Sequence, residues 1–213
     1  MSLWGAYHDA FRRDAHQLLA WGYQRAAGQI NSAQEETDIT GFIAEAIEDL
    51  IDNEAPPEYL RYCADEDRPF SSERRTGKNR KRLDIVIKDN GGIRPKPRYT
   101  FEAKRLRRKG HPLSVYLGRA GLRRFVTGEY ASSAPEAAML GYVQSETLDV
   151  WAEQLEEALP KRRTGLKLTQ GLMRTVVVME LTHCWTSRHQ RGEADEVTVC
   201  HILLNCAADS QPA

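Results

Sequence analysis

The chain lacks the features that define several classes of protein. No apolar run approaches the roughly 20 residues of a membrane-spanning helix. The opening MSLWGAYHDAFRR has neither the basic start nor the continuous apolar stretch of a secretory signal. A GxxxxGKS/T loop is also absent, which argues against a P-loop nucleotide hydrolase. We therefore expect a cytoplasmic protein with no membrane partner.

Cysteine is scarce, and its spacing is not that of a disulfide-rich protein. The four cysteines form no CxxC pair, so reduced thiols are expected. Histidines and cysteines gather near the end of the chain, but their spacing fits no zinc-finger pattern and adjacent positions on a strand face opposite ways, which argues against a zinc site. These residues are His183, Cys184, His189, Cys200, His201 and Cys206.

The net charge is zero, but the charges are sorted along the chain. Between Arg68 and Lys109, 16 Lys and Arg stand against 4 Asp and Glu, a net charge of +12. Between Glu35 and Asp67, 12 Asp and Glu stand against one Arg, a net charge of −11. The basic block suits the phosphates of nucleic acid, and the acidic block suits a metal ion. Alternatively, the two blocks pair with each other on the surface.

Hydrophobic spacing predicts an α/β domain with a central mixed sheet flanked by helices. Residues 1–34 are expected to form an N-terminal helical segment. Residues 35–213 are expected to form the domain, with a core at about 35–143 and a helix and β-hairpin extension at 144–213. Helices are predicted at 4–30 (one or two), 36–51, 115–126 and 147–159, and strands at 59–63, 83–87, 98–104, 138–143, 175–181 and 197–204.

Three charged residues interrupt the apolar strands at 83–87 and 98–104. Asp84 lies in the first, and Glu102 and Lys104 lie two residues apart in the second, so that their side chains share one face. A buried carboxylate needs a partner or a metal ion, and two carboxylates on neighbouring strands can hold one hard divalent cation. The alternative is a buried structural ion pair.

This set of groups suits phosphodiester hydrolysis. A cation held by Asp84 and Glu102 would polarise the phosphoryl group and acidify a bound water. Lys104 would orient that water or stabilise negative charge on the phosphate. Mg²⁺ is the expected ion, with Mn²⁺ as a substitute, because it accepts a few carboxylates and keeps water and substrate oxygens as its other ligands.

Asp84 in RLDIVI, followed by a hairpin loop and by Glu102-Ala103-Lys104 in YTFEAK, resembles the PD-(D/E)XK nuclease superfamily, whose fold is called restriction-endonuclease-like. Leu83 stands where many such proteins have proline. The resemblance implies a core of helix, three strands, helix and strand over about half of the chain, from residue 35 to 143. It also implies an endonuclease-type hydrolase acting on DNA, in the setting of bacterial or phage defence.

Members of that superfamily often carry a further acidic residue at the start of the preceding helix. Glu35 and Glu36 lie there, on the same side as the apolar stripe of residues 36–51. Glu36 is the preferred fourth site residue, either as a ligand or to position water. The alternative is that it compensates the helix dipole.

Basic clusters flank the proposed site in the sequence. They comprise residues 74–82 before Asp84, Arg105, Arg107, Arg108 and Lys109 after Lys104, and Arg123 and Arg124 on the next helix. Nucleic acid, expected to be DNA, is the predicted partner. A homo-oligomer or a defence-system protein is also considered. A catalytically inactive nucleic-acid-binding or assembly module, or another enzyme using the same carboxylates, remains an alternative.

One pattern near the end of the chain is left out of this site. Ser187, His189 and Arg191 are expected in the turn of the last hairpin. A structural or partner-surface role is favoured there over the lining of a cleft.

Overall fold

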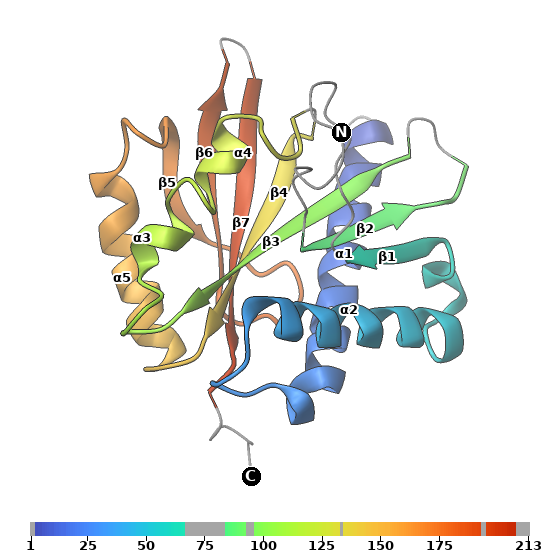
Figure 1. Ribbon diagram of the computed structural model, residues 1–213. Coiled ribbons are helices and arrows are strands. Elements are labelled where there is room, and N and C mark those ends of the chain that lie inside the picture. The colour runs from blue at the N-terminus through green and yellow to red at the C-terminus, as the bar shows by residue number, and fades with distance from the viewer. Residues whose placement is uncertain (1–2, 67–83, 93–95, 133, 193–194, 208–213) are drawn as a thin grey trace, which may run out of the picture.

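A seven-stranded mixed sheet runs through the molecule, in the order β1-β2-β3-β4-β7-β6-β5 (Figure 1). The computed structural model describes residues 3–66, 84–92, 96–132, 134–192 and 195–207. The strands are β1 (Tyr62–Glu66), β2 (Ile85–Asp89), β3 (Arg98–Leu106), β4 (Glu136–Val143), β5 (Leu168–Arg174), β6 (Cys184–Arg191) and β7 (Asp195–Asn205). Strand β4 pairs in parallel with β3 and β7, and the other neighbours pair antiparallel. The predicted α/β class with a central mixed sheet is confirmed.

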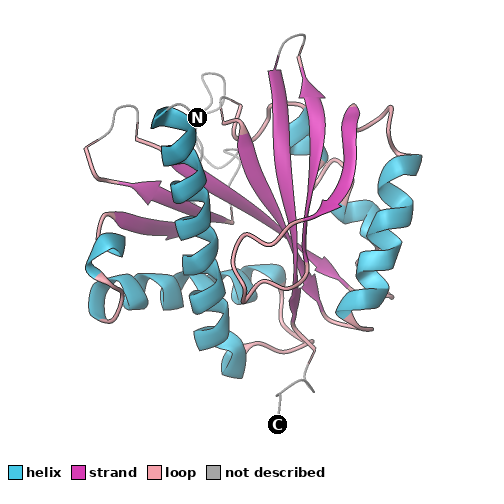
Figure 2. Ribbon diagram, turned by 180° about the vertical axis from the view of Figure 1, so that it is seen from behind, coloured by secondary structure: helices cyan, strands magenta, loops and turns pink. Residues whose placement is uncertain are grey.

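Helices cover both faces of the sheet (Figure 2). They are α1 (Leu3–Ala26), α2 (Glu36–Asn53), α3 (Leu113–Tyr116), α4 (Arg123–Val126) and α5 (Leu148–Lys161), with 3-10 turns at Ala27–Gln29 and Pro57–Tyr59. One apolar layer joins α1 and α2 to the sheet, and the other joins α3, α4 and α5 to its opposite face. Of the helices described, none is both long enough and apolar enough to cross a membrane.

The predicted helical stripe of α2 faces the core. Its residues Ile39, Ile43 and Ile47 are fully buried, whereas Glu45 is exposed. The spacing of three to four residues places these isoleucines on one side of the helix. This packing fixes the N-terminus of α2, and with it Glu36, beside strand β3.

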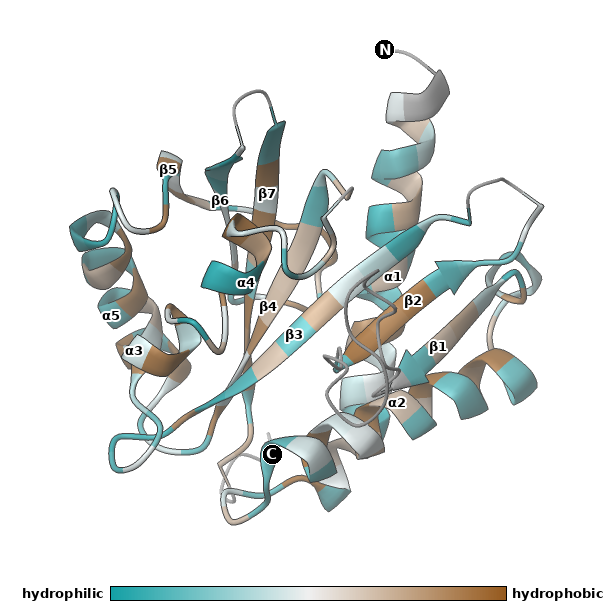
Figure 3. Cartoon of the chain, turned by 45° about the horizontal axis from the view of Figure 1, so that its top comes forward, coloured by the Kyte–Doolittle hydropathy of each residue, from teal (hydrophilic) through white to brown (hydrophobic). Residues whose placement is uncertain are grey.

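Strand β3 divides its side chains between the two apolar layers, and Figure 3 shows hydrophilic and apolar positions alternating along its middle. Phe101 and Ala103 join the layer of α1 and α2, while Leu106 joins the opposite layer. Because side chains alternate along a strand, Glu102 and Lys104 face the same side as Leu106. Both charged side chains therefore project into an otherwise apolar layer.

The predicted strand at 175–181 is wrong, because these residues form the connection between β5 and β6. Val176 and Met179 in this segment are 63% and 79% exposed, while Val178 and Leu181 are buried in the layer of α1. The apolar run thus fills a gap beside α1 without pairing as a strand.

The predicted turn around Ser187, His189 and Arg191 is also wrong, since all three lie inside β6 and are buried. Ser187 and His189 are hydrogen-bonded to each other, and Arg191 Nη1 donates to the carbonyl oxygen of Ala131, so these polar side chains can lie in the interior.

The single helix expected at 115–126 is instead two short helices, α3 and α4. The chain turns tightly at Gly121, where an added Cβ would lie 2.2 Å from the carbonyl oxygen of Tyr116. This close approach is possible only for glycine and lets the chain turn between the two helices.

Candidate active site

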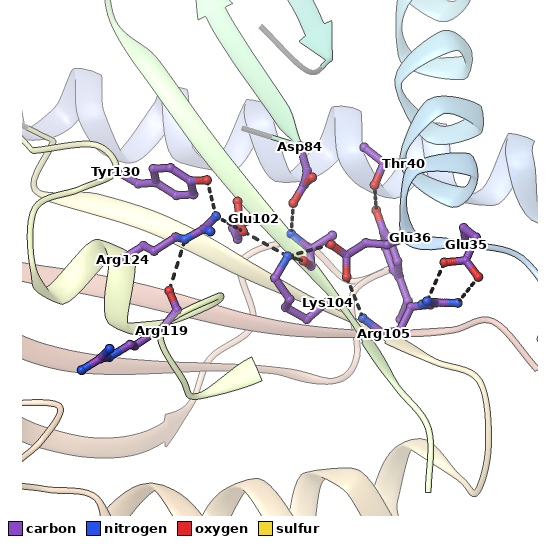
Figure 4. Close-up of polar contacts among 12 residues, drawn as sticks. Glu35, Glu36, Thr40, Asp84, Glu102, Lys104, Arg105, Arg119, Arg124 and Tyr130 are labelled. Atoms are coloured by element: carbon purple, nitrogen blue, oxygen red, sulfur yellow. Dashed lines mark hydrogen bonds and ion pairs between the residues drawn. The ribbon is translucent and has the colours of Figure 1, made fainter. Parts of the chain in front are cut away.

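The four predicted site residues meet beside β3, close to the point where its pairing with β2 stops (Figure 4). The ammonium group of Lys104 lies 2.7 Å from Glu36 Oε1 and 3.0 Å from Glu102 Oε1. Asp84, just before β2, places its carboxylate against Ala103, between Glu102 and Lys104. Glu36 comes from the first turn of α2. Three separate elements thus bring one lysine and three acids to a single place.

Along this edge of β3, the described part of β2 begins only at Ile85. Pairing of the two strands ends where Ile85 lies opposite Phe101. Beyond that point, Asp84 Oδ2 accepts the Ala103 N–H at 2.6 Å, and Glu36 Oε2 accepts the Arg105 N–H at 3.1 Å. The two carboxylates satisfy amide groups that a longer β2 would have paired.

Burial disfavours the ionised form of Glu102. The residue is 2% exposed, and burial, followed by repulsion from Asp84, raises the pKa of Glu102 to about 8. Burial likewise raises the pKa of Asp84 to about 6, although the Lys104 ammonium and the Ala103 amide oppose this shift. At pH 7 the pair therefore holds one proton, on Glu102, unless a cation replaces it.

Lys104 keeps its charge in spite of being buried. Burial alone would lower the pKa of this ammonium, but attraction by Glu102, Asp84 and Glu36 outweighs burial, and the pKa lies above its usual value. The site therefore presents a permanent cation beside two acids that compete for one proton.

The carboxylate oxygens of the site are suitable ligands for a hard divalent cation. Within the described part of the chain, no N–H or O–H group donates to the buried Oε2 of Glu102. A proton on Glu102 gives this acid a hydrogen bond to Asp84, which favours the ionised form of Asp84. A cation bound to both carboxylates would replace that proton and satisfy the remaining oxygen, and carboxylate oxygens are the ligands that Mg²⁺ and Mn²⁺ prefer.

Arg124 joins the site from α4. Its Nη1 lies 3.4 Å from Glu102 Oε1, and its Nε donates to the carbonyl oxygen of Arg119 at 3.2 Å. The guanidinium also lies 4.9 Å from the centre of the Tyr130 ring and donates to the Tyr130 hydroxyl. The sequence assigned Arg124 to the basic clusters that flank the proposed site, without predicting a contact with Glu102. No sequence pattern pointed to Tyr130.

Glu35 has a different position from Glu36. It is exposed and pairs with Arg105 at 2.6 Å, while Asp38 accepts the Glu35 N–H at 3.3 Å. The first turn of α2 is thus capped by Asp38, and Glu36 is directed to Lys104. Of the two candidates, Glu36 is the one that enters the site.

The basic residues after Lys104 lie near the end of β3. Arg107 and Lys109 are exposed, and Arg108 pairs with Glu146 at 3.3 Å. Arg123 is exposed at the start of α4. The basic segment at 74–82 lies outside the described residues.

Ser187 and His189 of β6 lie on the same face of the sheet as Glu102 but form a closed network with His201 of β7. Ser187 Oγ lies 2.7 Å from His189 Nε2 and 2.8 Å from His201 Nε2. The second nitrogen of each ring lies 2.7 Å from the Leu166 carbonyl oxygen and 3.0 Å from the Tyr116 hydroxyl, respectively. Each of these imidazole nitrogens has a partner, so the network is a structural part of the core.

No protein-family model, curated protein or solved structure matches the chain. The chemistry of the site is therefore the ground on which a function can be proposed. Two buried acids, an ammonium and a guanidinium at one strand edge are suited to holding a divalent cation next to a phosphate group.

Proposed function

We propose that the chain is a metal-dependent nuclease that hydrolyses phosphodiester bonds in DNA. Asp84 and Glu102 are the proposed ligands of Mg²⁺, with Lys104 as the catalytic cation and Glu36 as its partner. The observation that carries this proposal is Glu102, a buried acid beside Asp84 and beside a lysine that stays charged, whose Oε2 accepts no hydrogen bond from the described residues.

The cation and the side chains of the site have different roles at the phosphate. The cation, when bound, polarises the phosphoryl oxygen and acidifies a water. Lys104 holds its ammonium where negative charge grows on the phosphate or where the attacking water must be oriented. Glu36 keeps this ammonium in place through its contact of 2.7 Å. Arg124 supplies a second positive charge beside Glu102.

The arrangement of elements supports a restriction-endonuclease-like core and membership of the PD-(D/E)XK superfamily. Helix α2 is followed by β1, β2 and β3, then by α3 and α4, and then by β4, which is the expected order of helix, three strands, helix and strand. Glu102-Ala103-Lys104 lies within β3 as expected, whereas Asp84, expected inside the preceding strand, lies just before β2. In this proposal α5 and the β6–β7 hairpin extend the core, and the biological setting is bacterial or phage defence, with a defence-system protein or a second copy as partner.

One observation favours a second candidate, an inactive nucleic-acid-binding or assembly module. Asp84 and Glu36 each accept a backbone amide of β3. This contact gives both acids a structural role that would keep them in place in the absence of catalysis. It does not explain why Glu102 is buried beside Asp84, however, whereas the nuclease does.

Plasmid cleavage distinguishes the two candidates. The purified protein is incubated with supercoiled plasmid and Mg²⁺ or Mn²⁺, alongside Asp84→Ala, Asp84→Asn and Lys104→Ala. Glu45→Gln and Lys161→Ala are matched controls, because both side chains are exposed and lie outside the site. We expect nicking that the three site variants lose and the two controls keep. DNA binding without cleavage under either ion would support the inactive module instead.

A further inference from the structure

A second group of potential metal ligands lies on the opposite face of the sheet, between α1 and the β6–β7 hairpin. It consists of His16 on α1, Cys184 at the start of β6 and Cys200 in β7. One ring nitrogen of His16 and the two sulfur atoms lie within 4.8 Å of one another. The exposed fractions of the three residues are 0%, 0% and 3%, so the group lies in the core.

His16 has one ring nitrogen to spare. Its Nε2 lies 2.9 Å from the Tyr99 hydroxyl, whereas its buried Nδ1 has no hydrogen-bond partner in the described chain. Burial, followed by repulsion from Arg12, lowers the pKa of His16 to about 3, so the imidazole is neutral. A neutral imidazole with one nitrogen fixed by a hydrogen bond is the usual form of a histidine metal ligand.

The two thiols are placed to hold an ion between them. Their sulfur atoms are 3.0 Å apart, but the residues are not opposite each other, because Cys184 pairs with Ile202 and Cys200 pairs with Thr186. Such diagonal neighbours have Cα atoms about 7–8 Å apart, and disulfides usually join Cα atoms within about 4.4–6.8 Å. Two thiolates can reach one zinc ion at about 2.3 Å if the sulfurs separate by less than about 1 Å.

A surface cavity of about 250 Å³ gives access to this group, since Cys200, Tyr99 and Thr186 are among its lining residues. Arg12 and Glu136, paired at 2.9 Å, also line it. Two thiolates would neutralise a divalent cation, which removes the main cost of placing an ion in an apolar interior.

We propose that His16, Cys184 and Cys200 form a binding site for a thiophilic metal ion, namely Zn²⁺, with water from the adjacent cavity as the fourth ligand. Nitrogen and thiolate ligands select such an ion over Mg²⁺. The ion would tie α1 to the β6–β7 hairpin, and it is separate from the proposed Mg²⁺ site. This ion would explain why a buried imidazole and two thiols converge.

Metal content and Co²⁺ spectroscopy test the site. The full chain is purified under reducing conditions and loaded with Zn²⁺ or Co²⁺, together with Cys184→Ser, Cys200→Ser and the control Cys206→Ser. Cys206 is also a buried thiol, but it lies outside the cluster. We expect one zinc ion per chain, a thiolate-to-cobalt charge-transfer band in the near ultraviolet, and a rise of several degrees in the melting temperature with Zn²⁺. Cys206→Ser should keep all three effects.

The unmodified chain keeps the test decisive even if a cysteine variant folds poorly. Absence of stoichiometric zinc and of the thiolate band in the reduced, folded chain would overturn the proposal, as would equal loss of metal in Cys206→Ser. A second outcome would also overturn it. This outcome is a disulfide between Cys184 and Cys200, detected by mass spectrometry after purification without reductant, together with no uptake of Zn²⁺ once that disulfide has been reduced. Asp84→Ala should bind zinc normally, which separates this result from the outcome of the nuclease test.

Discussion

The acidic site around Glu102 and the polar network around Ser187 lie on the same face of one sheet and differ in their hydrogen bonding. Glu102 lies beside Met139 of β4, which in turn lies beside His201 of β7. With one strand between them, the two groups are separated by about 10 Å. Glu102 is buried to a degree similar to that of Ser187, His189 and His201. They therefore experience similar desolvation, and any difference between them comes from their partners.

In the network, each nitrogen of His189 and His201 has a partner, and the Ser187 hydroxyl joins the two rings. In the acidic site, Glu102 has an oxygen that accepts no hydrogen bond from the described residues, and its pKa is raised to about 8. A satisfied network stabilises one structure, whereas an unsatisfied acid keeps capacity for a ligand. The comparison separates buried polar groups that serve the fold from those that serve a reaction.

The largest expected effect comes from Glu102→Gln. We expect cleavage of plasmid to fall by about 10³-fold or more, as for groups that stabilise charge in a transition state. At pH 8 the melting temperature should rise, because the amide carries no charge in the buried site and can donate to Asp84. Initial cleavage rates and thermal unfolding at pH 8 check this. A large loss of stability with unchanged activity would place Glu102 with the structural network.

Ser187→Ala should have the opposite pattern. Removal of the hydroxyl leaves two buried ring nitrogens without a partner, at a cost of about 1–3 kcal/mol in the free energy of unfolding. The cleavage rate per folded molecule should stay unchanged, since the network does not touch the site. Denaturant unfolding and active-site-normalised cleavage measure the two quantities. A drop in cleavage without a drop in stability would show that the network takes part in the reaction.

The pH dependence of stability should also distinguish the two regions. Between pH 6.5 and 8 an unfolded Glu102 has lost its proton, while the folded residue, with a pKa of about 8, still binds one. The folded state binds more protons, so stability falls as pH rises through this range. His201 does not oppose this trend, because its lowered pKa of about 3 affects stability below pH 6.5.

Mg²⁺ should reverse that trend, because it replaces the proton on Glu102. Its apparent affinity should increase about tenfold for each pH unit between 6 and 8, as expected for the release of one proton. Isothermal titration calorimetry in buffers of different ionisation enthalpy would count that proton. Affinity that does not vary with pH would show that the ion binds elsewhere.

The smallest expected effect is that of Glu36→Gln, with Glu35→Gln as its matched control. The amide at residue 36 still accepts the Arg105 N–H, but it loses the charge-assisted contact with Lys104. We expect a loss of cleavage of roughly tenfold, since charged hydrogen bonds are worth about 1.5–3 kcal/mol. Glu35→Gln removes an exposed pair with Arg105 and should change the rate less. Equal effects would remove Glu36 from the site.

The sequence predicted the parts of the fold in which apolar spacing and burial agree. The stripe of Ile39, Ile43 and Ile47 predicted α2, and the alternation around Glu102 predicted which side chains share a face of β3. The expectation that Glu36 joins Asp84, Glu102 and Lys104 came from the resemblance to the PD-(D/E)XK superfamily, and the helical period placed it on the apolar side of α2. Each of these predictions depends on neighbours that are close in the sequence or on adjacent strands.

Other parts depend on contacts that no local pattern reveals. The sequence of strand β6 is polar, but the strand is buried. Burial is possible because Ser187 and His189 form hydrogen bonds with groups outside the strand, such as the Leu166 carbonyl oxygen. The contact of Arg124 with Glu102 depends on the turn at Gly121. The approach of His16 to two cysteines near the end of the chain arises only when α1 packs on the sheet. Tertiary partners, and not residue type, decided these outcomes.

Beyond its pairing with Ile85, the main chain of β3 positions two acids of the site. The amides of Ala103 and Arg105, which position Asp84 and Glu36, are two residues apart and hence about 6.6 Å apart along the strand. The separation of these two acids is set by the backbone, so exchanges of the side chain at position 103 among small residues should leave it intact. Proline is the exception, because it has no N–H to offer the carboxylate. The spacing of the acids is thus as rigid as the sheet itself.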